Sequence, residues 1–294
     1  IICWGNNPAT TSNTYWKYFI EAKEKGAKII TIDPRFSVSA ESSDQWLAIN
    51  PGTDTLTAIG MLRRIFAEAY RAGGHPEWVD EEFLKYHTNA PLLVDLSPAN
   101  FLDDDGVTPI SYASVGDKPY NKMYNLKLLS NASGEYMVNV AGTNVPAEEN
   151  KGRAGRSTAQ NPDLYYSDAN TTTVFNLMLA LYAGDNPDVQ AKFAGNVNLA
   201  NFFDPTYQDD VVEGYTGVTK TQIDKCADEF ASSSASMIIQ NMGGAMRTEN
   251  GGHMSALQCI LTLVTGNVGR PGTGVDDTSG YASFAGLQTG DQPK

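Results

Sequence analysis

The stretch IICWGNNPATTSNTYWKYFIEAKEKGAKIITIDPR, residues 1–35, decides the fold of this chain. Residues 1–4 are apolar without a break, as in a strand that is buried on both faces. Residues 14–25 carry apolar side chains at helical spacing before Gly26, a common helix stop, and residues 27–32 form a second apolar run. A strand, a helix and a strand in this order predict a right-handed crossover and hence a parallel sheet.

The same pattern continues outward along the chain. Residues 46–49 predict a third strand, and residues 56–70 predict a helix with one apolar face. Residues 213–274 show the pattern again, with an amphipathic helix, a strand at 235–240 and a second helix between two glycine-rich loops. The predicted fold class is therefore α/β, with parallel sheets flanked by helices in a Rossmann-like arrangement. The sequence leaves open whether the two regions share one sheet.

The middle of the chain differs in composition from the two regions on either side. Residues 91–212 are rich in Asn, Asp, Gly, Ser and Pro, which predicts long loops, except for residues 174–182, which suit a buried helix after a threonine cap. The acidic run 103–105 is expected to be a solvated turn, because no further carboxylates follow it at metal-ligand spacing. We expect three parts: a Rossmann-like domain at 1–90, a second α/β region with long loops at 91–274, and a polar tail at 275–294.

Composition argues against several classes of protein. The 294 residues carry a net charge of −13, and the 21 Lys and Arg side chains are spread along the chain, so no nucleic acid partner is expected. No apolar run reaches the length of a membrane span, and no targeting segment is recognisable. The cysteines and histidines lack the spacing of a metal site. We expect buried apolar thiols and surface or capping imidazoles: Cys3, Cys226, Cys259, His75, His87 and His253.

Three turns at the carboxyl ends of predicted strands carry polar groups suited to a ligand. The first is Gly5-Asn6-Asn7-Pro8, where the glycine permits close approach of the backbone and the two amides can donate and accept. The second places Asp33 directly after a strand, near the position where a dinucleotide fold sets a carboxylate against a ribose hydroxyl. The third offers Thr53 and Asp54 at the start of a helix. An N-cap role alone would also explain Asp54.

The turns favour a guanine nucleotide over NAD. The first turn lacks the G-x-G-x-x-G pattern that lets a pyrophosphate lie directly on a helix. Guanine presents two adjacent donors, N1–H and the exocyclic amine, which one carboxylate accepts in parallel, whereas adenine presents a donor beside an acceptor. The carboxylate of Asp54 would therefore favour guanine, although turns rich in Gly, Asn and Asp also occur as plain structure.

Four motifs follow one another along the chain: WGNNPATT (4–11), GAKIITIDPRFSVSAESSDQWLAINPGTDTLTAIGML (26–62), NMGGAMRTENGG (241–252) and LVTGNVGRPGTG (263–274). Their succession resembles the molybdopterin oxidoreductases of the dimethyl-sulfoxide-reductase family. The resemblance covers residues 1–94 and about 213–274 well and the middle loosely. It implies that residues 1–90 are the dinucleotide-binding domain and that the polar tail at 275–294 is a cleft loop near the cofactor. It implies the catalytic subunit of an anaerobic reductase or dehydrogenase, with two molybdopterin guanine dinucleotides on one molybdenum, a small-molecule substrate and a partner subunit that carries Fe–S clusters.

Carried over by position, the resemblance implies cofactor-binding residues in this chain, and neither catalytic nor metal-binding ones. The family's dinucleotide contacts fall on the three turns: Trp4, Gly5, Asn6, Asn7 and Thr10; Ile32, Asp33, Pro34 and Arg35; and Gly52, Thr53 and Asp54. Amides and a helix end would face phosphate, Asp33 the ribose and Asp54 the guanine. A fourth group would approach the pterin: Met242, Gly243, Gly244 and Met246. Relatives often carry a polar residue at the position of Met246, so Arg247 and Thr248 are expected to replace it.

The resemblance also predicts what lies outside this stretch. The family's metal ligand and a cysteine cluster for Fe–S belong before the first strand, and a further domain closes over the cofactors. We therefore expect an internal fragment that has no turnover alone, with or without bound cofactor. A targeting signal would lie upstream, so neither the compartment nor the substrate is predicted. The alternatives are a non-catalytic scaffold subunit of an electron-transfer complex and a nucleotide-binding module with the same fold.

Overall fold

A computed structural model describes residues 1–96, 127–147, 160–193, 199–241 and 247–277 of the chain. Contacts group the chain into two compact units. Unit 1 holds Ile1–Met61, Asp209–Thr262 and Asn267–Lys294, and unit 2 holds Leu62–Gln208 and Leu263–Gly266. The division into domains at residues 90 and 274 stays a prediction. Over the described ranges, no helix combines the length and the apolar character needed to cross a bilayer.

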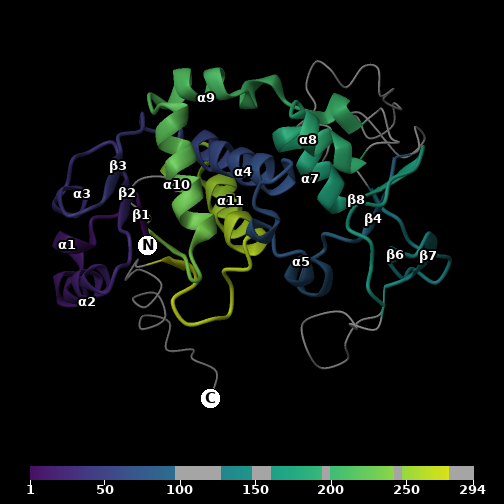
Figure 1. The fold of residues 1–294 in the computed structure, drawn as a ribbon, viewed down its shortest axis with the longest axis horizontal. Helices are drawn as coiled ribbons and strands as arrows, with labels where there is room; N and C mark the ends of the chain where they lie inside the picture. Colours follow the sequence, from purple (N-terminus) through teal and green to yellow (C-terminus); the bar gives the residue numbers. More distant parts are fainter. Residues whose placement is uncertain (97–126, 148–159, 194–198, 242–246, 278–294) are drawn as a thin grey trace. The chain divides into compact units, whose positions relative to one another are not determined.

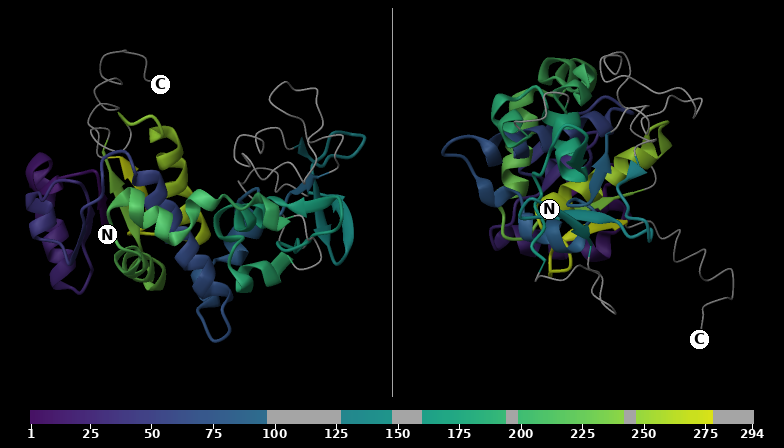
Figure 2. Two further views of the ribbon diagram at one scale, coloured as in Figure 1. Left: turned by 90° about the horizontal axis from the view of Figure 1, so that it is seen from above. Right: turned by 90° about the vertical axis from the view of Figure 1, so that its right-hand side faces the viewer.

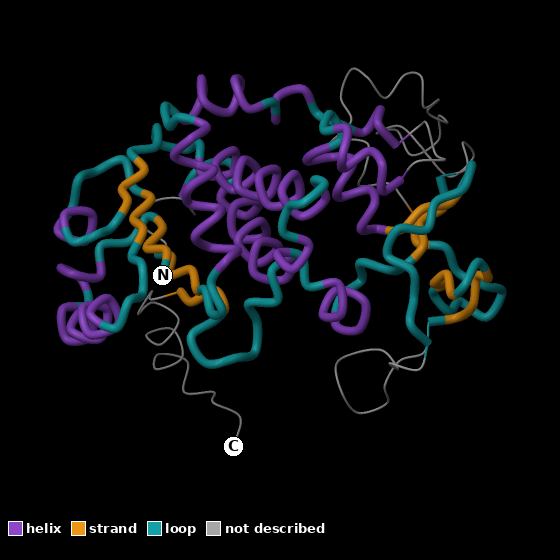
Figure 3. Tube along the Cα trace, in the orientation of Figure 1, coloured by secondary structure: helices purple, strands orange, loops and turns teal. Residues whose placement is uncertain are grey.

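A parallel sheet forms the core of unit 1 (Figures 1 and 3). In spatial order its five strands are β10 (Gly274–Asp277), β9 (Met237–Gln240), β1 (Ile2–Trp4), β2 (Ile30–Ile32) and β3 (Gln45–Leu47). Every neighbouring pair is parallel, which confirms the predicted fold class. Ile2 lies opposite Ile30 on one side and Ile238 on the other, and all three are buried. Their apolar character is what a strand covered on both faces requires.

Strand β9 joins this sheet directly beside β1. Whether residues 213–274 share the first sheet was open from the sequence, and the pairing of Trp4 with Gln240 shows that they do. No local pattern predicts this contact, because the two strands lie near opposite ends of the chain. The connections β1 to β2 to β3 run toward one edge of the sheet, whereas β9 to β10 runs toward the other. The winding therefore reverses between β1 and β9.

Helices cover both faces of the sheet. Figure 1 and the left view of Figure 2 show α1 (Pro8–Thr11), α2 (Asn13–Glu24) and α3 (Val38–Glu41) on one side, and α10 (Lys220–Ser232), α11 (Gly251–Val264) and the start of α4 (Asp54–Tyr70) on the other. Helix α9 (Asp209–Thr216) precedes α10. A capping box of Thr219 and Gln222 begins α10. Its apolar positions are buried at helical spacing: Ile223, Cys226, Ala227 and Phe230.

Helix α2 forms where the sequence predicts a helix, but none of its residues is buried. Tyr15 and Tyr18 are 65% and 55% exposed, and the rings of Trp16 and Phe19 stack on each other with centroids 5.2 Å apart. The spacing of apolar residues thus predicted that this helix forms, but not how far it is buried. Spacing shows which residues share a helix face and does not show what packs against that face.

Two of the three cysteines are buried as expected, Cys3 and Cys226, but the expectation is wrong for Cys259, which is exposed. Cys259 lies on α11. The buried apolar positions of that helix repeat every three or four residues: Met254, Leu257, Leu261 and Val264. Cys259 falls on the opposite face, which helical spacing alone would have indicated.

Unit 2 combines helices with short antiparallel strands. One sheet has the order β5 (Lys127–Leu128), β4 (Leu93–Asp95) and β8 (Thr171–Thr173), and β6 (Met137–Val140) pairs with β7 (Thr143–Pro146). The helices are the remainder of α4, α5 (Glu81–His87), α7 (Val174–Ala183) and α8 (Pro187–Gln190), with 3-10 turns at Pro76–Trp78, Ala191–Phe193, Leu199–Phe202 and Pro205–Tyr207. The sequence did not predict these strands, because two to four residues are too few to show a period.

Other expectations for the middle and the end of the chain meet the structure only in part. The predicted cap of α7 is confirmed, since the hydroxyl of Thr173 accepts a hydrogen bond from the backbone N–H of Asn176 at 3.1 Å. The acidic run 103–105 lies outside the described residues. Strand β10 reaches Asp277, so the first residues of the expected polar tail belong to the sheet, and residues 278–294 lie outside the described residues.

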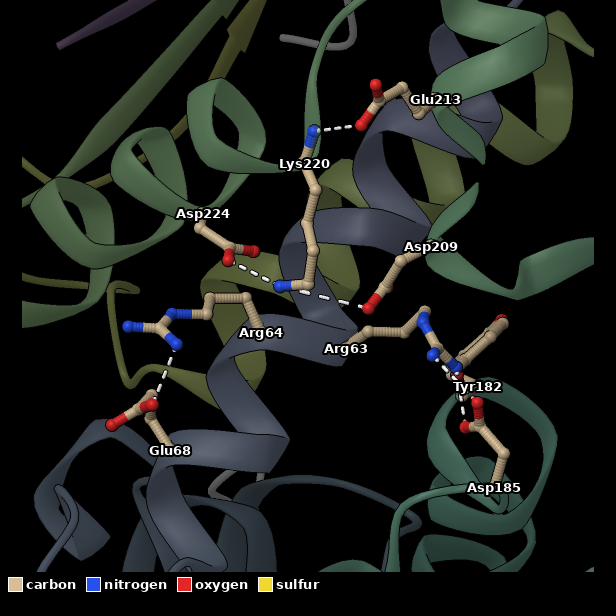
Figure 4. Close-up of polar contacts among 9 residues, drawn as sticks. All are labelled: Arg63, Arg64, Glu68, Tyr182, Asp185, Asp209, Glu213, Lys220 and Asp224. Atoms are coloured by element: carbon tan, nitrogen blue, oxygen red, sulfur yellow. Dashed lines mark hydrogen bonds and ion pairs between the residues drawn. The ribbon is translucent and has the colours of Figure 1, made fainter. Parts of the chain in front are cut away.

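Arg63 anchors α4 within unit 2 (Figure 4). Its guanidinium donates to both carboxylate oxygens of Asp185, at 2.8 and 3.0 Å, and to the carbonyl of Tyr182 at 2.8 Å. The Arg63 side chain is only 10% exposed, so solvent weakens these hydrogen bonds little. The next residue, Arg64, pairs instead with Glu68, which also binds Arg71.

Arg63→Met is expected to lower the free energy of unfolding by about 2 kcal/mol, because it removes charge-assisted hydrogen bonds from a largely buried position. Arg64→Met is the matched control and should lower it by less than about 0.5 kcal/mol, because ion pairs four residues apart on a helix contribute little and Arg71 still binds Glu68. Urea unfolding of both variants measures the difference. Equal losses would contradict the role of Arg63 as an anchor.

Candidate functional site

The carboxyl ends of the parallel strands in unit 1 meet at one edge of the sheet. Gly5 follows β1, Asp33 follows β2 and Asn241 follows β9. In open α/β sheets, ligands bind at this edge where the winding reverses, because the turns there diverge and leave a crevice. In this sheet the reversal falls between β1 and β9. The sequence identified the turns after β1, β2 and β3, but it could not identify the partner of β1 at the reversal.

The turn after β1 is tied to both neighbouring strands. Gly5 has a φ of +58° and donates its backbone N–H to the carbonyl of Ile32 at 2.8 Å. Asn6 is 1% exposed, and its side-chain nitrogen lies 3.5 Å from the carbonyl oxygen of Gln240 in β9. The side chain of Ile32 is fully buried, so this residue contacts the turn through its backbone carbonyl alone. The structure therefore places Gly5 and Asn6 beside the point of reversal.

Asn7 and Thr10 stabilise the turn itself. The side-chain oxygen of Asn7 accepts from the hydroxyl of Ser39 at 2.8 Å, and its nitrogen donates to the hydroxyl of Thr10 at 3.0 Å. The bond to Ser39 connects the first turn to α3, and the bond to Thr10 closes the turn onto α1. The helix end expected to face phosphate belongs to α1, which is only four residues long. Any anion contact at this turn would rest on backbone N–H groups more than on a helix dipole.

The turn after β2 holds Asp33. Its carboxylate accepts from the backbone N–H of Arg35 at 2.8 Å, and the indole of Trp46 donates to its backbone carbonyl at 2.8 Å. Partial burial raises the pKa of the Asp33 carboxyl, and the N–H and positive charge of Arg35 offset part of that shift. Pro34 and Arg35 are exposed. Asp33 is thus half-buried at the edge of the sheet.

The turn before α4 brings Asp54 to Trp4, the last residue of β1. The indole Nε1 of Trp4 donates to Oδ1 of Asp54 at 2.9 Å, and both side chains are buried, at 0% and 6% exposed. Burial raises the pKa of the Asp54 carboxyl, the hydrogen bond from Trp4 and a backbone N–H lower it, and the charge of Asp33 raises it again. Helix α4 begins at Asp54 itself. A cap role does not account for a carboxylate that reaches across to a strand.

The same turn approaches the segment that follows β9. Gly52 has a φ of +85°, and a Cβ built on it would lie 3.8 Å from the methyl group of Thr248. The hydroxyl of Thr53 donates to the carbonyl of Asn50 at 2.7 Å and so closes the turn. The third predicted turn therefore lies beside Thr248, which belongs to the third motif, residues 241–252.

The remaining predicted residues lie outside the described residues: Met242, Gly243, Gly244 and Met246. Arg247 is exposed and Thr248 half-buried. Within the described ranges, no group of three or more His, Cys, Asp and Glu side chains is arranged to hold a metal ion.

The fold and the residues at the carboxyl edge of the sheet define a class of protein. It is an α/β protein whose strand-end turns offer carboxylate, amide and glycine groups to a ligand. Comparison with known protein families identifies the family within this class. The model of the molybdopterin oxidoreductase family matches residues 1–291, and the chain belongs to that family. Membership implies a molybdopterin cofactor. The resemblance found in the motifs is thereby confirmed.

Curated relatives support the same family. The alpha subunit of respiratory nitrate reductase from Haloferax mediterranei is 28% identical over 94% of this chain and 25% of its own length. The alpha subunit of perchlorate reductase from Dechloromonas aromatica is 26% identical over 94% of this chain and 28% of its own length. A dimethyl sulfoxide reductase catalytic subunit from Halobacterium salinarum, described as putative, is 37% identical over 37% of this chain and 12% of its own length. The chain thus spans about a quarter of the two relatives that it matches throughout.

Asp54→Asn is expected to raise the free energy of unfolding at pH 7, with a smaller gain at pH 4. A carboxyl whose pKa is raised on folding binds its proton more tightly in the native state, so wild-type stability falls as the pH rises from the unfolded pKa of about 3.9 through the native pKa. Asparagine keeps an acceptor for Trp4 and has no charge to bury. Urea unfolding at both pH values measures the gain.

Asp224→Asn is the control for this experiment, because Asp224 lies on α10 and pairs with Lys220 at the surface (Figure 4). It should give no gain at pH 7. A loss of stability in Asp54→Asn that grows with pH would contradict the assignment of a raised pKa.

Proposed function

We propose that this chain is part of the catalytic subunit of a molybdenum-dependent oxidoreductase and that its sheet edge binds the guanine end of a molybdopterin guanine dinucleotide. The observation that carries the proposal is the buried carboxyl group of Asp54, which lies at the strand ends beside Trp4 and within electrostatic range of Asp33. Buried carboxyl groups with a raised pKa are uncommon outside functional sites, because their burial destabilises the fold.

The chemistry of this edge fits the proposed group. Guanine presents N1–H and an exocyclic amine as neighbouring donors, and an ionised carboxylate at residue 54 accepts both. Asp33 supplies a second carboxylate in the neighbouring turn, suited to the hydroxyls of a ribose. Gly5 and Gly52 have positive φ angles, so their turns bring the backbone, without a Cβ in the way, to the edge where the nucleotide would lie.

The roles of the residues follow from this placement. When bound, the cofactor supplies the two-electron or oxygen-atom chemistry of its metal. The residues of this chain bind and orient: Asp54 selects the base, Asp33 holds the sugar, and the turn at Gly5 and Asn6 faces the region between β1 and β9.

The proposal extends to the whole protein of which this chain would be part. Relatives are named as alpha subunits of nitrate and perchlorate reductases. We infer a small-molecule substrate reduced or oxidised at the molybdenum, a second dinucleotide on the same metal, an Fe–S cluster held by upstream residues and an Fe–S electron-transfer subunit as partner. The family acts on many substrates with one fold, so no single substrate is proposed.

Titration calorimetry with GDP and ADP tests the guanine assignment directly. The wild-type chain should bind GDP more tightly than ADP, and Asp54→Ala should weaken GDP binding by about tenfold to a hundredfold, the range for hydrogen bonds to a charged group. ADP binding should change little.

Asp224→Asn again serves as the control, and it should bind GDP like the wild type. Equal affinity of wild type and Asp54→Ala for GDP, or a preference for ADP, would contradict the proposal.

A further inference from the structure

We propose that Trp4 is a positioning residue that holds the Asp54 carboxylate as a guanine acceptor, and that its indole N–H sets how strictly the site selects guanine. This inference rests on the proposed function. It concerns a side chain that itself touches no part of the base in this assignment.

The contact between the two residues is specific. Trp4 ends β1 and Asp54 begins α4, so the hydrogen bond of 2.9 Å joins two elements that are 50 positions apart in sequence. Trp4 is fully buried and Asp54 nearly so, and the pair therefore lies away from bulk water. An indole N–H only donates, so it stabilises an acceptor oxygen and has no lone pair with which to accept a proton from the acid.

The hydrogen bond restricts rotation of the carboxylate. Oδ1 accepts the indole N–H of Trp4, and a carboxylate has about four acceptor sites, so this bond and the backbone N–H together leave acceptor capacity for a ligand. Guanine needs two acceptors side by side, and a carboxylate free to rotate would present them together only part of the time. By restricting that rotation, Trp4 reduces the conformational entropy that the Asp54 carboxylate would lose when guanine binds.

The same hydrogen bond controls the charge of the carboxyl group. Burial and the charge of Asp33 both favour the protonated acid, whereas the indole of Trp4 and a backbone N–H favour the ionised form. A protonated acid presents one donor and one acceptor, which no longer matches the two donors of guanine. Loss of the indole N–H would thus weaken guanine binding and shift its pH dependence.

Trp46 provides an internal comparison. It lies on β3 of the same sheet, and its indole also donates a hydrogen bond, but to the backbone carbonyl of Asp33 at 2.8 Å. A backbone carbonyl has no charge to control. Trp46→Phe therefore removes an indole N–H from the same region of the fold without touching the acceptor of the base.

The experiment compares Trp4→Phe with Trp46→Phe in titrations with GDP and IDP between pH 5 and 8. IDP keeps N1–H and lacks the exocyclic amine, so the ratio of the two affinities reports acceptance of both donors by one carboxylate. Trp4→Phe should weaken GDP binding by about tenfold and lower the GDP-to-IDP ratio. The pH at which GDP binding falls to half should rise in this variant. Trp46→Phe should leave the ratio unchanged, because the ratio reports only on the acceptor at residue 54.

An unchanged ratio and an unchanged pH profile in a folded Trp4→Phe variant would overturn the inference. If that variant does not fold, benzothienylalanine at position 4 replaces it, because this residue has a ring of nearly the same size with sulfur in place of N–H; the same two readouts then decide. Failure of the proposed function looks different, since the wild type itself would then show no preference for GDP over ADP and no loss on Asp54→Ala.

Discussion

The pairing of β1 with its two neighbours is the constraint on which the rest of this structure depends. Strand β1 has three residues, yet it lies at the centre of the sheet between β9 and β2. Through it, the first turn of the chain meets the end of β9, and Trp4 meets the start of α4. Burial on both faces stabilises this strand, because β1 and β2 consist of apolar or fully buried residues.

Two acidic residues of α4 show how differently one helix uses carboxylates. Glu68 is buried but bound by Arg71 and Arg64, and its hydrogen bond to Arg71 holds the pKa of its carboxyl below the ordinary value. Its ionised form is therefore paired within the fold. Burial raises the pKa of the Asp54 carboxyl, since its side-chain donor, Trp4, is uncharged and offsets only part of that shift, and the charge of Asp33 adds to it. A buried carboxylate without a cationic partner is more typical of a functional site than of a structural one, which is why the proposed binding role is placed on Asp54.

Much of unit 1 could be predicted from the sequence. The strands β1, β2, β3 and β9 and the helices α2, α4, α10 and α11 follow apolar patterns that local spacing determines. The pairing of β9 with β1 could not be predicted, since it depends on contacts between segments that are far apart in the sequence. Nor could the exposure of α2 be predicted, because the burial of a helix depends on what packs against it. The exposure of Cys259 does follow from helical spacing along α11, which the prediction of a buried thiol did not use. The short strands of unit 2 give too little pattern to detect.

The sequence predicted which residues make up the candidate site and where they lie along the chain, but not the contacts between them. Asp33 and Asp54 were identified from their place after strands, and the structure brings them within range of one another. That Asn7 binds Thr10 and Ser39, and that Trp4 donates to Asp54, follows only from the three-dimensional arrangement. The family assignment came from four ordered motifs and is confirmed by a match over nearly the whole chain.

The brevity of the central strand has a consequence for folding. Side chains alternate between the two faces of a strand, so a slip of β1 by a single position would turn the indole of Trp4 to the opposite face and away from α4. A misregistered chain would then lose the hydrogen bond that joins β1 to α4, and the Asp54 carboxylate would lose its indole donor. The cost of burying that carboxylate with one donor fewer therefore favours the correct register of the sheet.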